Sequence, residues 1–88
     1  MKKNKYAQIP ERIVDLHGLT VDEAEHALSQ LVNEFSEMQI RVIIGKGIHS
    51  PHGPVLPNFV KNYLTNRGIP FRQSKLHEGG EGALEVFF

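Results

Sequence analysis

Residues 13–23, with the sequence IVDLHGLTVDE, decide the fold, because they pass from a strand pattern to a helix start within a few positions. Apolar and polar side chains alternate at the beginning of this stretch, as they do in a half-buried strand. The alternation puts Val14 and Leu16 on one face and Asp15 and His17 on the other. An acid and an imidazole are therefore predicted to point the same way at the end of a strand.

A helix is predicted to follow at once. Thr20 and Glu23 have the spacing of a capping box, in which each side chain satisfies the backbone N–H of the other residue. The apolar residues of the segment are three and four positions apart, the spacing of one buried helix face. They are Val21, Ala24, Ala27, Leu28, Leu31, Val32 and Phe35.

Three further strand patterns and a second helix pattern complete the chain. Residues 40–44 are almost entirely β-branched, and residues 69–75 and 83–88 are the remaining strand candidates. Between the second and third strands, apolar residues recur at helical spacing and end before Gly68, a residue typical of helix ends. The predicted order of elements is βαβαββ.

This order predicts an α/β fold, a two-layer sandwich with two helices on a four-stranded mixed sheet. A strand–helix–strand crossover joins parallel strands, so we expect the first three strands to be parallel and the last to be antiparallel. The carboxyl ends of the first three strands then share one edge, where ligands of open α/β sheets bind. Asp15, His17, the loop at 45–53 and the glycine turn at 77–82 are expected to meet there.

Length and composition limit the class of protein. A chain of 88 residues forms one domain with a single core. We expect residues 1–10 to be a flexible basic N-terminal arm and residues 11–88 to be the folded domain. The absence of cysteine, of a secretory signal and of an apolar run of membrane length predicts a cytoplasmic protein with no membrane partner.

The charges are segregated although their sum is zero. Residues 20–37 hold five acids and no Lys or Arg, whereas residues 38–77 hold six Lys or Arg residues and no acid. An anionic ligand would be attracted to the second segment if the fold exposes its cations together. The alternative is that both segments are simply solvated faces.

Three motifs resemble those of the Smr (small MutS-related) domain family, in the same order along the chain. The resemblance covers residues 13–88, and its only departure is Val14, where leucine is frequent. It implies a stand-alone Smr-type endonuclease, a phosphodiester hydrolase or transesterase that cleaves or nicks DNA or RNA, including RNA at stalled ribosomes. The matching stretches are VDLHGLT at 14–20, EA at 23–24, GKGIHS at 45–50 with Gly53, and GGEGA at 79–83.

The resemblance implicates the Asp-X-His motif and the glycine loop, and the chemistry of phosphodiester cleavage suggests a role for each residue. The reaction needs a base for the nucleophile, an acid for the leaving oxygen and stabilisation of the phosphate charge. His17 is the predicted general base or acid, because histidine changes its charge near neutral pH. Asp15 would orient its ring, and His49 is the candidate for the opposite role.

The loop after the second strand is expected to bind the phosphate. Lys46 would neutralise its charge, and the N–H groups of Gly45 and Gly47 can approach it because no side chain obstructs them. The loop is not a Walker P-loop, since it lacks the earlier glycine and the following Ser or Thr, so no nucleotide cofactor is expected. The predicted phosphate-binding residues are Lys46, Gly45, Gly47, Ser50, Arg41, Arg72 and Lys75.

Alternative functions remain open at this stage. Asp15 and His17, with His49 or His52, could ligate a divalent metal. A single carboxylate makes a two-metal centre improbable, and the 2′-hydroxyl of RNA could serve as nucleophile, so we predict that no metal is obligatory. The same basic edge could instead belong to a non-catalytic nucleic-acid or ribosome-binding module, and the acidic first helix could serve as a protein contact.

Overall fold

The elements follow one another in the predicted order, βαβαββ. The structure, a computed structural model, describes residues 10–45, 55–75 and 82–88. Nearly all of the predicted N-terminal arm, residues 1–9, lies outside these ranges. The elements are β1 (Arg12–Asp15), α1 (Val21–Glu34), β2 (Gln39–Ile43), α2 (Val55–Asn66), β3 (Phe71–Gln73) and β4 (Ala83–Phe87).

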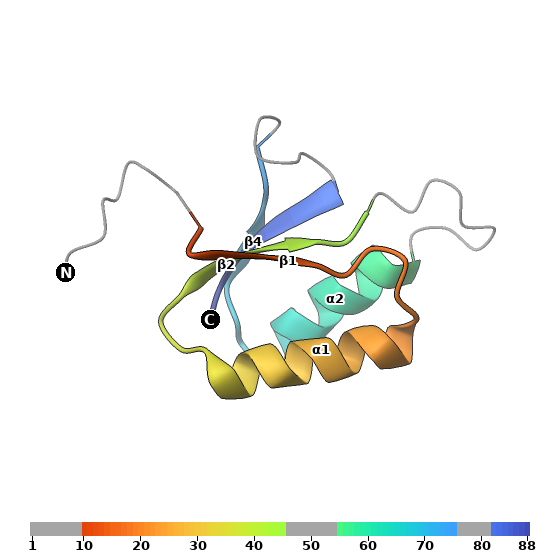
Figure 1. Ribbon diagram of the computed structural model, residues 1–88, viewed down its shortest axis with the longest axis horizontal. Helices are drawn as coiled ribbons and strands as arrows, with labels where there is room; N and C mark the ends of the chain where they lie inside the picture. Colours follow the sequence, from red (N-terminus) through yellow and green to blue (C-terminus); the bar gives the residue numbers. More distant parts are fainter. Residues whose placement is uncertain (1–9, 46–54, 76–81) are drawn as a thin grey trace.

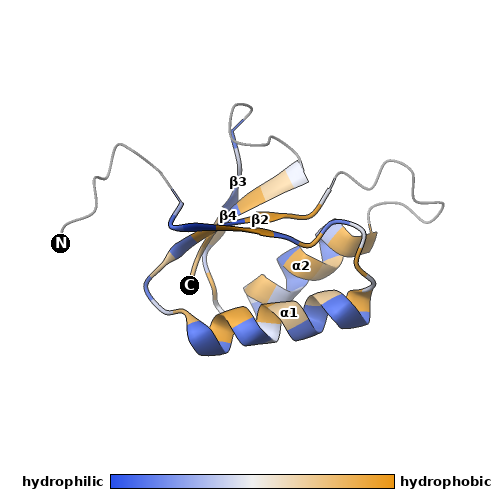
Figure 2. Cartoon of the chain, in the orientation of Figure 1, coloured by the Kyte–Doolittle hydropathy of each residue, from blue (hydrophilic) through white to orange (hydrophobic). Residues whose placement is uncertain are grey.

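The two helices lie on the same face of the sheet, which makes a two-layer α/β sandwich (Figure 1). The other face of the sheet carries no helix from the described part of the chain. Hydrophilic residues of α1 lie on the side away from the sheet (Figure 2). The amphipathic spacing of its sequence therefore determines which side packs.

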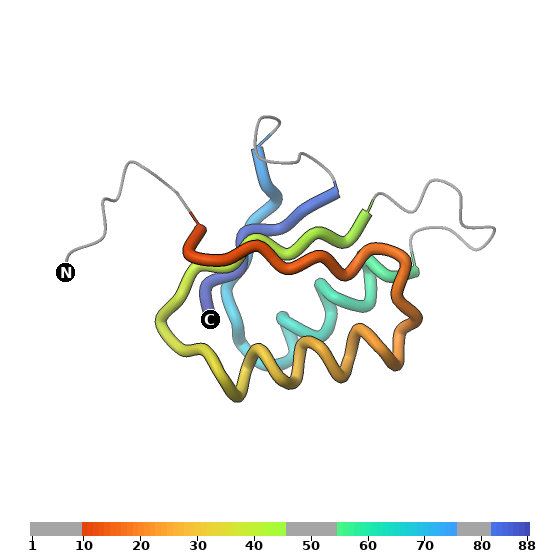
Figure 3. The backbone as a smooth tube through the Cα atoms, in the orientation of Figure 1, coloured from red at the N-terminus to blue at the C-terminus, as the bar shows by residue number. Residues whose placement is uncertain are grey.

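The strands are arranged in the order β1-β2-β4-β3. β1 pairs with β2 in parallel, and β4 is antiparallel to both β2 and β3. β1, β2 and β3 thus share one direction and β4 opposes them, as predicted, and the chain path in Figure 3 follows this course. The strand prediction did not include the position of β4 between β2 and β3, which leaves β3 hydrogen-bonded to β4 rather than to a parallel neighbour.

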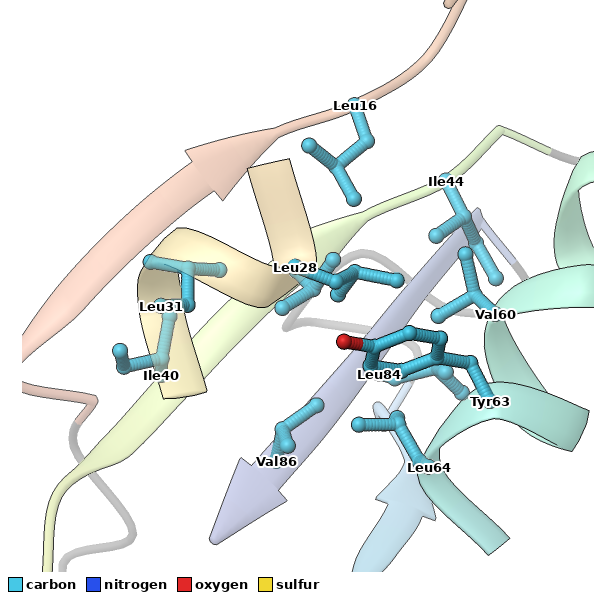
Figure 4. Packing of buried hydrophobic residues seen from close by; sticks show 11 residues of the cluster. Leu16, Leu28, Leu31, Ile40, Ile44, Val60, Tyr63, Leu64, Leu84 and Val86 are labelled. Carbon is cyan, nitrogen blue, oxygen red and sulfur yellow. The ribbon is translucent and has the colours of Figure 1, made fainter. Parts of the chain in front are cut away.

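Side chains from both helices, from β2 and β4, and from the residues just beyond the ends of β1 and β2 form the core between the layers (Figure 4). The strand residues that face the helices alternate with residues that face the open side, as the pleat requires. Burial of this apolar surface is the main favourable contribution to folding. The buried cluster contains Leu16, Leu28, Leu31, Ile40, Val42, Ile44, Val60, Tyr63, Leu64, Leu84 and Val86.

The capping box predicted for α1 is present. The Thr20 hydroxyl accepts a hydrogen bond from the Glu23 N–H at 3.2 Å, and the Glu23 carboxylate accepts one from the Thr20 N–H at 2.9 Å. The backbone bond from Thr20 is the main reason that the pKa of Glu23 is lowered. Neither described helix is long and apolar enough to cross a membrane.

Two isoleucines on neighbouring strands provide a test of the core. Ile40 is fully buried, whereas Ile13 is 56% exposed. We expect Ile40→Ala to lower the free energy of unfolding by about 2–5 kcal/mol, because it leaves a cavity. Ile13→Ala should lower it by less than about 1 kcal/mol. Urea unfolding of both variants measures the difference, and equal losses would contradict the arrangement of the two layers.

Candidate functional site

Asp15 and His17 stand together where β1 ends, on the open face of the sheet. Leu16 between them is buried, and its N–H donates a hydrogen bond to the Ile43 carbonyl at 2.7 Å. This anchor turns the two neighbouring side chains to the opposite face, as the alternation predicted. The Asp15 side chain is 49% exposed and the His17 side chain is 66% exposed, so a substrate can reach both.

The two side chains form a hydrogen-bonded dyad. Asp15 Oδ1 accepts a bond from the His17 N–H at 3.0 Å and lies 2.5 Å from His17 Nδ1. The side-chain bond, followed by the backbone bond, lowers the pKa of the Asp15 carboxyl. Because an ionised carboxylate can only accept, Nδ1 carries the proton and Nε2 is the ring nitrogen left for chemistry.

Gly45 connects the second motif to this dyad. It follows β2 with a φ of 73°, a conformation that strains any residue with a side chain. A Cβ at this position would lie 3.5 Å from the Cβ of His17, so the backbone passes directly beside the dyad. The loop that begins with Gly45 therefore leaves the sheet at the predicted edge.

Gly82 connects the third motif to the same place. Its carbonyl accepts hydrogen bonds from the N–H groups of Ile44 at 2.8 Å and Gly45 at 3.1 Å. The described parts of all three motifs thus meet at the edge. The Gly45 N–H, which we expected to face a phosphate, is already used in this bond, and Gly45 contributes instead by its conformation and its contact with His17.

Several predicted site residues lie outside the described ranges. They belong to the loop after β2, and their roles stay predictions. They are Lys46, Gly47, His49 and Ser50, together with His52 of the alternative metal site.

The predicted cations of the sheet do not gather at the dyad. Arg41 lies opposite Ile13 in the β1–β2 register, two positions before the strand end. Its Nε donates to Glu85 Oε2 at 2.8 Å, which makes it one half of a largely buried ion pair. Arg72 donates from Nη1 to the Gln73 carbonyl at 3.1 Å, and Lys75 is an exposed residue just beyond β3.

Glu85 is an ionisable residue that the sequence interpretation did not single out. It is fully buried in β4 and accepts hydrogen bonds from Gln39 Nε2 at 2.9 Å, Arg41 Nε at 2.8 Å and Ser74 Oγ at 2.6 Å. Burial raises the pKa of this carboxyl, but the three donors outweigh burial and the net effect is a lowered pKa. The only signal in the sequence was one acid within the apolar run 83–88.

The described residues do not form a three-ligand metal cluster. Within 10–45, 55–75 and 82–88, no group of three His, Cys, Asp or Glu side chains is placed to hold an ion. Asp15 and His17 would supply two ligands of the alternative metal site. His49 and His52 belong to the loop outside these ranges.

Comparison with known proteins places this architecture in a family. The pattern of the Smr domain matches residues 14–88. An uncharacterized protein of Treponema pallidum is 39% identical over an alignment 84 positions long, gaps included, that covers 89% of this chain and 41% of that protein. The protein named Endonuclease NBR9 of Saccharomyces cerevisiae is 35% identical over an alignment 75 positions long that covers 81% of this chain and 30% of that protein. The chain thus spans less than half the length of either relative.

Solved structures show the same fold. The Smr domain of Thermus thermophilus MutS2 superposes with a TM-score of 0.71 at 29% identity, over 86% of this chain and 95% of that one. The human small-MutS related domain gives a TM-score of 0.65 at 29% identity, over 85% of this chain and 98% of that one.

The dyad predicts a measurable change in an acid pKa. We expect His17→Ala to raise the pKa of Asp15 toward the ordinary value of about 3.9, with part of the lowering retained through the backbone N–H. In the wild type, the lowered pKa of Asp15 contributes stability to the folded state. This contribution is fully present above about pH 4, near the pKa of the unfolded chain, and it is lost as the pH falls through the lowered pKa of the folded state. Carboxyl ¹³C NMR titration measures the shift. His26→Ala is the control, and an unchanged Asp15 titration in His17→Ala would contradict the dyad.

Proposed function

This chain belongs to the Smr domain family, and from that premise we propose that it is an endonuclease that cleaves or nicks phosphodiester bonds in DNA or RNA. The observation that carries the proposal is the exposed Asp15–His17 dyad at the sheet edge. A relative named as an endonuclease supports it, although the match spans only 30% of that protein. Nucleic acid is accordingly the proposed partner.

The dyad suits His17 to act first as a general base. With the Nδ1 proton held by Asp15, the lone pair of Nε2 can take a proton from water or from a 2′-hydroxyl. Asp15 fixes the tautomer and the ring orientation, and it stabilises the imidazolium that forms. The mechanism then needs an acid for the leaving oxygen and a cation for the phosphate, and we propose His49 and Lys46 for these roles.

The donor set favours acid–base catalysis without an obligatory metal. A two-metal centre needs several carboxylates, and among the described residues beside the dyad Asp15 is the only one. That carboxylate already accepts two hydrogen bonds from His17 on a single oxygen. The competing mechanism uses a single divalent ion, which needs fewer carboxylate ligands than a two-metal centre.

Loss of the imidazole should abolish catalysis and preserve binding. We expect His17→Ala to lower the cleavage rate by about 10²–10⁴-fold, because Nε2 is the proposed base. Affinity for single-stranded RNA, nicked DNA and duplex DNA should change by no more than about threefold, since most nucleic-acid affinity comes from phosphate contacts. Gel-based cleavage and binding assays provide both readouts.

His26→Ala is the matched control, because His26 is an exposed histidine on α1 and has no proposed role. It should cleave at the wild-type rate. Wild-type protein that binds nucleic acid but cuts none of these substrates, with or without divalent ions, would support a non-catalytic binding module instead.

Chelation and a modified substrate separate the mechanisms. We expect cleavage to persist in EDTA, because His17 supplies the proton transfer without a metal. For an RNA substrate, a single 2′-deoxy nucleotide at the cut position distinguishes attack by the 2′-hydroxyl, which it blocks, from attack by water, which it permits. Loss of all activity on chelation would restore the metal mechanism.

A further inference from the structure

Glu85 is a buried acid that the proposed mechanism does not use. It lies in the middle of β4, on the face of the sheet that the helices do not cover, and none of its surface is exposed. Isolated buried charges are costly, so this carboxylate is expected to be fully partnered, and it is.

The partners of Glu85 come from both sides of β4. Arg41 lies directly opposite it on β2, and Gln39 lies two residues earlier on the same strand. Ser74 comes from the other side, one residue beyond the end of β3. A single carboxylate therefore links three neighbouring segments of the sheet, and we call these four residues the Glu85 clamp.

The clamp specifies the register of β4. A slip by one residue would turn Glu85 toward the apolar layer, because side chains alternate between the faces of a sheet. A slip by two residues would keep the face but separate the carboxylate from the donors that now surround it. Either slip would leave a buried charge without its partners, which is strongly unfavourable.

The register of β4 in turn determines the position of the candidate site. Gly82 immediately precedes β4, and its carbonyl bonds the N–H groups of Ile44 and Gly45. Gly45 is the residue whose backbone passes beside His17. A displacement of the start of β4 would therefore be transmitted through Gly82 and Gly45 to the dyad.

We propose that Glu85 is a positioning residue of the candidate site, and that its clamp holds the Gly82 carbonyl on Gly45 and Gly45 against His17. Ser74 is the part of the clamp nearest that site, since its N–H also donates to the Ala83 carbonyl at 3.1 Å. Gln39 joins the clamp at the opposite end, across from Phe87. The expected effect of the clamp on cleavage rests on the proposed function, whereas its effect on the positions of Gly82, Gly45 and His17 does not.

The two ends of the clamp offer matched variants. Ser74 and Gln39 are 5% and 8% exposed, and each donates one hydrogen bond to Glu85. We expect Ser74→Ala to shift the amide resonances of Gly45 and Gly82 and the ring resonances of His17 in NMR spectra. It should also lower kcat about tenfold, as small misplacements of catalytic groups do, with KM nearly unchanged. Gln39→Ala removes the donor at the end of the clamp farther from the site, so it should shift these resonances and lower kcat clearly less than Ser74→Ala does.

Equal effects of the two variants on the site resonances, or no effect of either, would show that the clamp is only structural and would overturn the proposal. If Ser74→Ala does not fold, Ser74→Cys replaces the hydroxyl with a weaker donor and should produce the same shifts at smaller amplitude. The resonances require no substrate. An inactive wild-type protein would thus refute the endonuclease proposal while NMR still decides the positioning role.

Discussion

The carbonyl of Gly82 accepts hydrogen bonds from two successive N–H groups, those of Ile44 and Gly45, and the arrangement of the sheet edge depends on this interaction. The first bond continues the pairing of β2 with β4 by one residue. The second requires the chain to turn at Gly45, whose φ of 73° suits glycine. The Gly82 carbonyl therefore makes the last contact of the β2–β4 pairing and also holds the backbone of Gly45, which passes beside His17.

Local patterns in the sequence were sufficient for much of the fold. The apolar spacing of α1, the capping box at Thr20 and Glu23 and the alternation around Leu16 each involve residues a few positions apart, and the structure confirms them. The shared direction of β1, β2 and β3 followed because each helical crossover returns the chain to the end of the sheet at which the preceding strand began. The contact between Asp15 and His17 could be predicted for the same reason, because only one residue stands between them in the sequence.

Interactions between distant residues could not be obtained in this way. Gln39 and Glu85 are 46 positions apart, and nothing near either residue indicates the other. Arg41 was predicted to bind phosphate because the sequence shows its charge but not its partner, which is Glu85. The same local patterns are compatible with several strand orders. The observed order, with β4 between β2 and β3, depends on packing across the whole sheet.

The open face of the sheet has a consequence for the way in which a polymer approaches the dyad. Asp15 and His17 stand about half or more exposed at the surface, rather than at the bottom of a tunnel. No described residue encloses the dyad, so the nucleic acid proposed as substrate can lie against it at any point along its length, with no terminus to be threaded. Such geometry selects by local shape rather than by distance from an end, and it suits attack on internal bonds.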